Sequence, residues 1–133
     1  MTLFLDANVI IYLVEGTQAL QGRVAKALGK YRTRADPVAV SRLSWLECRV
    51  RPLREKNKPV LVAYESFFAA RDLVIVELSA PVIEAAAQLR AVLNFSTPDA
   101  LQAASALQIA GPVRFFSNDR RLAKIPGLTV ESV

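Results

Sequence analysis

The sequence predicts an α/β fold with a mostly parallel central sheet that is covered by helices on both faces. Short apolar runs alternate along the chain with longer segments whose apolar residues recur at helical spacing. Strands that alternate with helices in this way favour a parallel sheet with both faces buried. The chain has 133 residues, 53% of them apolar, and no internal repeat or long Pro/Gly/Ser linker. We therefore expect a single domain over residues 1–133.

The elements of the first half follow from apolar spacing and turn residues. Gly16 separates two helical patterns. Pro52 is expected to kink or interrupt a third, because a proline inside a helix removes a backbone hydrogen bond. In order, we expect a strand at 2–5 (TLFL), helices at 8–14 and 19–31, a turn at 34–37, a strand at 38–41 (VAVS) and a helix at 42–57.

Prolines and glycines divide the second half. Pro81 and Pro98 stand near helix starts, where the fixed φ of proline is tolerated, and Gly111-Pro112 ends a helix. In order, we expect a helix at 60–71, a strand at 73–78 (LVIVEL), helices at 81–93 and 97–110, a strand at 113–117 (VRFFS), a short helix at 119–124, a Pro126-Gly127 turn and a strand at 128–130 (LTV).

The composition excludes several kinds of catalytic site. The chain contains no histidine, so it cannot build a Ser-His-Asp triad, a Cys-His pair or a histidine-containing zinc site. Its one cysteine, Cys48, cannot form an intramolecular disulfide, and we expect it to be a small buried residue in a reducing, cytoplasmic setting. The apolar opening LFLDANVIIYLV lacks a basic leader and carries Asp6 in its middle, so we expect neither a signal peptide nor a membrane span.

The charge balance favours a polyanionic partner. There are 17 Lys and Arg residues against 12 Asp and Glu, a net charge of +5. Only 22% of the residues are charged, which leaves room for apolar surface that another chain would cover. An ordinary solvated helix face is the alternative explanation for each arginine. The candidates for contacts with the backbone of such a polyanion are Arg42, Arg49, Arg51, Arg54, Arg120 and Arg121.

Four carboxylates stand where an apolar run meets a turn or a helix: Asp6, Glu47, Asp99 and Asp119. Asp6 and Asp119 follow expected strands, so both should lie at the carboxyl edge of the sheet, where α/β proteins form their sites. Carboxylates that converge repel one another and need a cation such as Mg²⁺ or Mn²⁺ to stay ionised together. The sequence therefore predicts a metal site made of oxygen ligands.

Each carboxylate also has an ordinary structural explanation. Asp6 or Asn8 could cap the first helix, and Asp119 the last one. Asp99 would sit in the first turn of a helix, where the dipole favours an anion. The segment from Ser44 to Glu47 matches a capping box. Capping alone does not explain why strand ends and helix starts should all face one edge.

Four motifs in this order resemble those of the PIN-domain ribonucleases, and their length and order are most similar to the VapC toxins of toxin–antitoxin pairs. The resemblance extends from residue 3 to residue 130. The motifs are LDANVIIY (5–12), SRLSWLECR (41–49), TPDA (97–100), and FSNDRRL with IPGL (116–122 and 125–128).

This resemblance implies a Rossmann-like α/β/α sandwich, Mg²⁺- or Mn²⁺-dependent endoribonuclease activity, homodimerisation and a VapB-like antitoxin partner. Asp6, Glu47, Asp99 and Asp119 match the acidic quartet of the family, with Asp6 and Asp99 as principal metal ligands. Asn8 and Ser117 match its neighbouring polar positions. Many relatives carry His shortly after the third acid, where this chain has Gln102.

Other functions remain as alternatives. A phosphatase of the haloacid-dehalogenase type would need a second Asp where this chain has Asn8, and no glycine-rich nucleotide motif or Walker loop is present. A PIN nuclease that matures RNA without an antitoxin, or an inert RNA- or protein-binding PIN module, fits the same motifs. The inert module has little need to keep four mutually repelling carboxylates.

Overall fold

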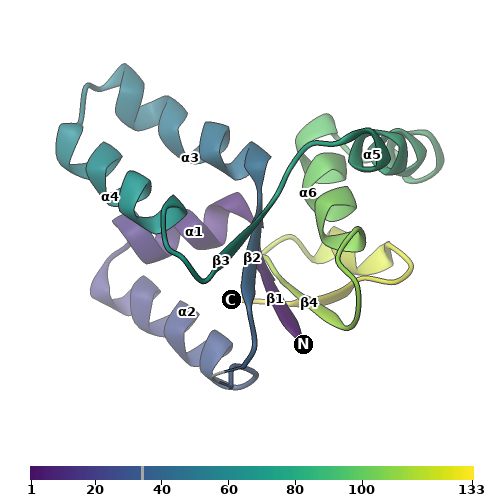
Figure 1. Ribbon diagram of the computed structural model, residues 1–133, viewed down its shortest axis with the longest axis horizontal. Helices are drawn as coiled ribbons and strands as arrows, with labels where there is room; N and C mark the ends of the chain where they lie inside the picture. The colour runs from purple at the N-terminus through teal and green to yellow at the C-terminus, as the bar shows by residue number, and fades with distance from the viewer. Residues whose placement is uncertain (34) are drawn as a thin grey trace.

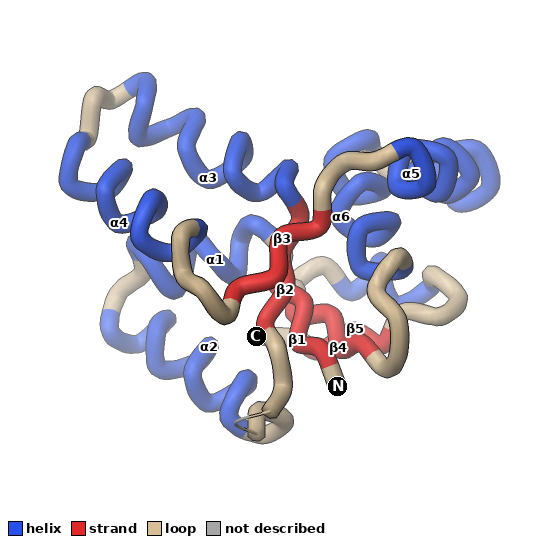
Figure 2. Tube along the Cα trace, in the orientation of Figure 1, coloured by secondary structure: helices blue, strands red, loops and turns tan. Residues whose placement is uncertain are grey.

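The computed structural model describes residues 1–33 and 35–133 and shows a five-stranded sheet in the order β3-β2-β1-β4-β5. Each described pairing is parallel, so the sheet is parallel throughout rather than mostly so. Figure 2 shows the strands as a central layer with helices on either side. The expected α/β/α sandwich is confirmed. The strands are β1 Thr2–Leu5, β2 Val38–Ser41, β3 Leu73–Val76, β4 Val113–Phe116 and β5 Thr129–Glu131.

The helices lie close to the expected segments. They are α1 Ala7–Glu15, α2 Gln18–Gly29, α3 Arg42–Arg54, α4 Lys58–Phe68, α5 Ala80–Leu93, α6 Thr97–Leu107 and the 3₁₀ helix η1 Arg120–Lys124. Helix α3 continues through Pro52 and ends at Arg54. Helix α4 begins earlier than expected, because Asn57 caps it by accepting the backbone N–H of Val60, and it also ends earlier, at Phe68. Of the expected turn at 34–37, Arg34 lies outside the described residues.

No described helix is long and apolar enough to cross a membrane.

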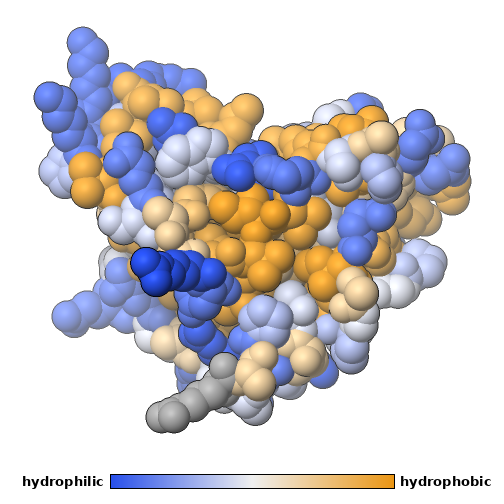
Figure 3. Space-filling view, viewed as in Figure 1, coloured by the Kyte–Doolittle hydropathy of each residue, from blue (hydrophilic) through white to orange (hydrophobic). Residues whose placement is uncertain are grey.

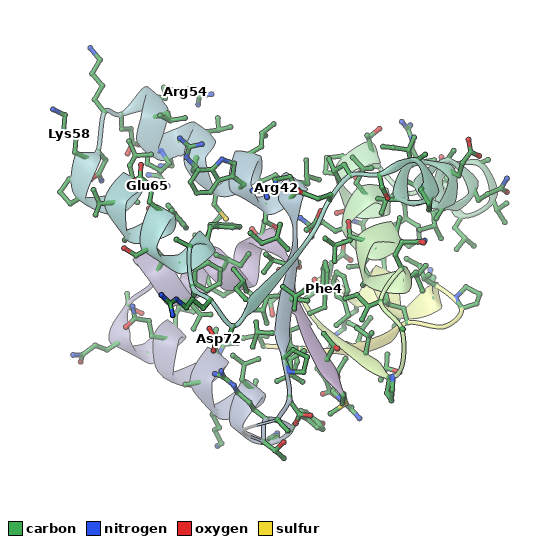
Figure 4. All side chains as sticks on the ribbon, in the orientation of Figure 1. Phe4, Arg42, Arg54, Lys58, Glu65 and Asp72 are labelled. Atoms are coloured by element: carbon green, nitrogen blue, oxygen red, sulfur yellow. The ribbon has the colours of Figure 1, made fainter. Side chains whose placement is uncertain are left out.

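Alternating residues of the strands build two separate cores. Leu3 and Leu5 of β1 pack on one face with residues of α1 to α4, whereas Phe4 packs on the other face with residues of α5, α6 and η1. Figure 1 shows these two groups of helices on opposite sides of the sheet, and Figure 4 places Phe4 between them. Phe4 stacks on Phe115 with ring centroids 5.0 Å apart. The central strands are therefore buried on both faces, which explains their unbroken apolar sequences.

The connections of the chain create a switch point at the middle of the sheet. From β1 the chain proceeds outward to β2 and β3, then crosses to the other side of β1 to form β4 and β5. Helices that follow β1 and β4 therefore lie on different faces, and their first residues diverge at the carboxyl edge between these two strands. Ligand sites in open parallel sheets form at this position. Asp6 follows β1 there, and Ser117 follows β4.

The Phe4–Phe115 stack gives a direct test of the core on the α5 and α6 side. Phe4 is fully buried, so we expect Phe4→Ala to lower the free energy of unfolding by about 3–5 kcal/mol through lost burial and a residual cavity. Urea unfolding followed by circular dichroism measures this change. Val92→Ala, at an exposed position of α5, is the control and should change stability by less than about 0.5 kcal/mol. Equal effects from both variants would contradict the assigned core.

Candidate active site

The position of Asp6 is fixed by the end of the central strand, β1. Its backbone N–H donates to the carbonyl of Phe116 at 3.2 Å, which ties it to β4, and its carboxylate then caps α1 by accepting the N–H of Val9 at 3.0 Å. The residue is 9% exposed. The capping role expected of Asp6 is therefore real, and it holds a nearly buried carboxylate at the switch point.

Glu47 does not belong to a capping box. Helix α3 begins at Arg42 with Ser41 as its N-cap, so Ser44 lies inside the helix and is fully buried. The capping-box interpretation was wrong because β2 ends at Ser41 and the helix starts immediately after it. Glu47 instead accepts a hydrogen bond from Nε2 of Gln102 at 2.9 Å, across the space between α3 and α6. Its carboxylate thus has no capping role.

Asp99 lies in the first turn of α6, as expected. Ser96 is the N-cap, and its hydroxyl both accepts the N–H of Asp99 at 3.4 Å and donates to Oδ2 of Asp99 at 2.9 Å. The dipole of α6 favours an anion at this position. The helix start therefore fixes Asp99 in place while leaving one of its oxygens for another partner.

These three carboxylates line one small pocket of about 70 Å³ at the carboxyl edge of the sheet, together with Ala7, Asn8, Pro98 and Gln102. Burial raises the pKa of Asp6, against hydrogen bonds from Ser117 and from the backbone of Val9 and Asn8 that lower it. Burial likewise raises the pKa of Glu47, the bond from Gln102 lowers it, and the charges of Asp6 and Asp99 raise it further. The charges of these acids therefore act against one another inside the pocket.

Gln102 is a part of the pocket that sequence reasoning treated only as a departure from the family pattern. It is 5% exposed, and its Nε2 bridges Ser44 and Glu47 at 2.9 Å each. Its carbonyl oxygen Oε1 is buried and makes no hydrogen bond in the structure as described. The spacing of Gln102 from Asp99, three residues along one helix, was a signal that both could face one site.

Asp119 lies beside this pocket and is bound to an arginine. It caps η1 by accepting the backbone N–H of Arg121 at 3.0 Å, and the guanidinium of Arg121 returns to the same carboxylate through Nε at 3.0 Å and Nη2 at 2.6 Å. Nη2 of Arg121 also lies 3.3 Å from Oδ2 of Asp99. The Arg121 guanidinium lowers the pKa of Asp119. Arg121, which the sequence predicted to contact RNA, therefore links Asp99 and Asp119.

The two polar neighbours differ in exposure. Ser117 is almost fully buried, its Oγ accepts the N–H of Asp119 at 3.0 Å, and its hydroxyl also lowers the pKa of Asp6. It thus connects the ends of β1 and β4. Asn8 is exposed at the pocket rim in the first turn of α1, so it does not cap that helix.

Several of the arginines that were expected to contact RNA interact with other residues of the same chain. Arg42 pairs with Glu77 at 2.5 Å, Arg49 lies 3.9 Å above the ring of Trp45, and Arg51 pairs with Glu55 at 3.0 Å. Arg54 and Arg120 are exposed. Figure 4 places Arg42 and Arg54 at opposite ends of α3, so the arginines of this helix form no single compact patch.

The donor set of the pocket suits a hard divalent cation. Its polar lining consists of carboxylate and amide oxygens, and the buried Oε1 of Gln102 is a spare neutral acceptor among them. Within residues 1–33 and 35–133, no three carboxylates stand close enough together to bind one ion as they lie. Asp6, Glu47 and Asp99 share the pocket, whereas Asp119 is held to Arg121. A bound ion would therefore draw these acids closer together.

The family is shown by comparison with known proteins. Residues 3–128 match the model of the PIN domain, and the chain belongs to that family. No match was found among the curated proteins.

Solved structures of toxin–antitoxin proteins share the fold. VapBC2 from Rickettsia felis, bound to a DNA fragment from its promoter, is 20% identical with a TM-score of 0.75, covering 100% of this chain and 99% of that one. A toxin–antitoxin complex from Klebsiella pneumoniae is 22% identical with a TM-score of 0.68, covering 97% and 96%. The sarcin-ricin-loop-cleaving toxin VapC20 from Mycobacterium tuberculosis is 18% identical with a TM-score of 0.72, covering 91% and 92%. The expected resemblance to VapC proteins is confirmed in the fold.

The raised pKa values of Asp6 and Glu47 predict how stability depends on pH without metal. The folded state binds these protons more tightly than the unfolded chain, so stability should fall as the pH rises from the ordinary values of 3.8 and 4.5 through the raised ones. The lowered pKa of Asp119 acts in the opposite sense, below its ordinary value of 3.8. Asp6→Asn keeps an oxygen for the Val9 N–H and should be more stable than the wild type at pH 7.

Urea unfolding in EDTA between pH 4 and pH 7 measures this effect. Glu84→Gln, at an exposed position of α5, removes one negative charge away from the pocket and should leave the pH dependence unchanged. An Asp6→Asn protein that is less stable than the wild type at pH 7 would show that the buried charge of Asp6 does not destabilise the fold.

Proposed function

We propose that the chain is a metal-dependent endoribonuclease that acts as the toxin of a toxin–antitoxin pair. One observation carries the proposal: three carboxylates from three separate segments of the chain, Asp6 after β1, Glu47 within α3 and Asp99 in the first turn of α6, line a single pocket at the switch point of the sheet. The PIN fold and the likeness to VapC structures support it. Glu47 adds weight, because the structure removes its capping explanation.

The residues of the chain would divide the work at this site. Asp6 and Asp99 would be the principal ligands of Mg²⁺ or Mn²⁺, with Glu47 and Asp119 completing the set. When bound, the ion would offset the charge that develops on the phosphate and activate water for in-line attack. Ser117, which follows β4 beside the end of β1, would orient the Asp6 carboxylate, and the exposed Asn8 would contact water or substrate at the rim. Hydrolysis by water would leave 5′-phosphate and 3′-hydroxyl ends.

The surface supplies two features that suit the proposed partners. The net charge of +5 and the exposed Arg54 and Arg120 suit an RNA backbone. For a protein partner, α3 exposes an apolar stripe of Leu46, Val50 and Leu53 at helical spacing. Figure 3 also shows apolar surface in the middle of the molecule, where Figure 1 places the edge strand β3 with its exposed Val74. We propose that an antitoxin and a second copy of the chain cover these surfaces.

Removing one charge from the pocket should abolish activity without unfolding the protein. We expect Asp99→Asn to reduce RNA cleavage by more than about 100-fold, since even groups that merely orient metal ligands contribute about 10–100-fold. EDTA should stop cleavage by the wild type, and Mn²⁺ or Mg²⁺ should restore it. Cleavage of a labelled RNA by purified protein measures both effects, with Glu84→Gln as the charge-matched control. Full activity of Asp99→Asn, or activity that resists EDTA, would refute the proposed site.

The toxin assignment is tested separately. Coexpressed wild-type chain should copurify with the product of the adjacent reading frame, and that product should relieve growth inhibition. Val50→Asp places a charge in the apolar stripe of α3 and should weaken the complex. The control Glu65→Ala changes an exposed residue of α4 outside that stripe and should leave binding intact. A chain that cleaves RNA but has no such partner would be a solitary PIN nuclease.

A further inference from the structure

Arg121 is a cation that contacts two of the proposed metal ligands, Asp99 and Asp119. Its guanidinium grips Asp119 with two hydrogen bonds, from Nε to Oδ1 at 3.0 Å and from Nη2 to Oδ2 at 2.6 Å. The same Nη2 reaches Oδ2 of Asp99 at 3.3 Å. A two-pronged contact of this kind is the strong geometry for an arginine and a carboxylate. One positive group of the chain itself therefore joins two acids that lie 20 residues apart in the sequence.

Arg121 occupies oxygens that the proposed ion could also use as ligands. Both oxygens of Asp119 accept hydrogen bonds from the guanidinium, and Oδ2 of Asp99 is shared between Ser96 and Arg121. An ion cannot bind these lone pairs while the guanidinium holds them in this geometry. The contact thus accounts for the position of Asp119, turned to Arg121 rather than grouped with the three acids of the pocket.

The ion pairs of Arg121 with Asp99 and Asp119 are nevertheless weak enough to break. Its side chain is 67% exposed, so water competes for the guanidinium and screens the ion pairs. Asp99 and Asp119 are only 32% and 26% exposed, so the acids stay in place when the arginine leaves. Both are also fixed by helix-start hydrogen bonds, to Ser96 and to the backbone of Arg121. The arginine is the movable member of the group.

We propose that Arg121 is an internal counterion that competes with the divalent cation for Asp99 and Asp119. Without the ion, the guanidinium neutralises these two carboxylates. When the ion binds, Arg121 must swing away, and this displacement lowers the affinity of the site for metal. This inference rests on the proposed nuclease site. It adds that a residue of the chain itself, Arg121, limits the affinity of that site for metal.

Metal binding to the purified, EDTA-stripped protein tests the competition directly. We expect Arg121→Gln to bind Mn²⁺ about 3–10-fold more tightly than the wild type in calorimetry, because the ion no longer displaces an ion pair of modest strength. Arg120→Gln is the matched control: it removes the same charge from the neighbouring exposed position of η1, and Arg120 takes no part in the contacts of Arg121 with the two acids. Arg121→Lys keeps the charge but loses the two-pronged geometry, so its affinity should lie between those of the wild type and Arg121→Gln.

A second measurement follows the guanidinium itself. The Nε–H resonance of Arg121, assigned by its loss in Arg121→Gln, should shift as Mg²⁺ is added and saturate with the metal affinity of the wild type. An unchanged resonance at saturating Mg²⁺ would overturn the inference. So would Arg121→Gln affinity that is equal to or weaker than that of the wild type, or equal to that of Arg120→Gln.

These outcomes separate the inference from the proposed function. RNA cleavage that depends on metal, combined with unchanged Mn²⁺ affinity in Arg121→Gln, would refute the counterion and leave the nuclease intact. Tighter Mn²⁺ binding by Arg121→Gln without RNA cleavage by any variant would support the counterion and refute the nuclease. Absence of Mn²⁺ binding in both the wild type and Arg121→Gln would refute the counterion, since Asp99 and Asp119 would then show no competition to relieve.

Discussion

The structure depends on keeping a carboxyl group nearly buried at the end of its central strand. Asp6 follows β1, which is covered on both faces, so its carboxylate has little access to water. Burial of a charge is costly unless hydrogen bonds or an opposite charge compensate it. Here the N–H groups at the start of α1 and the hydroxyl of Ser117 supply part of that compensation. The backbone turn after β1 and the end of β4 are therefore arranged around one side chain.

Capping does not compete with the proposed role of these carboxylates as metal ligands. Asp6 and Asp119 cap helices, and Asp99 is bound to the cap of α6, so each has a local partner that holds its side chain still. A fixed carboxylate is a better ligand than a mobile one, because less freedom is lost on binding. Glu47 lacks a cap and is held instead by Gln102 from another helix. Helix capping is therefore compatible with the proposed metal site at Asp6, Asp99 and Asp119, whereas Glu47 has no capping role.

The fold could be predicted from the sequence because its signals are local. Alternating apolar runs identified the five strands, and Asp6 could be placed because it directly follows one of them. The start of α3 at Arg42 was predicted from the helical pattern of the segment, whereas the capping-box interpretation of Ser44–Glu47 was wrong, because Ser41 at the end of β2 already caps the helix. The contacts of Gln102 with Ser44 and Glu47, and of Arg121 with Asp99, join separate elements. Their geometry depends on how the elements pack, which residue spacing does not encode.

The charges of the site are balanced in two different ways, and this division has a physical consequence. Burial raises the pKa values of Asp6 and Glu47, and the donors that oppose this effect are neutral: backbone N–H groups, Ser117 and Gln102. Asp119 relies on a full positive charge, which lowers its pKa. Neutral donors can remain in place when a cation arrives, because they bind only part of each carboxylate, whereas a guanidinium must give up the oxygens it occupies. If the proposed cation binds, it would therefore displace no charged group beside Asp6 and Glu47, whereas beside Asp119 it would have to displace the guanidinium of Arg121.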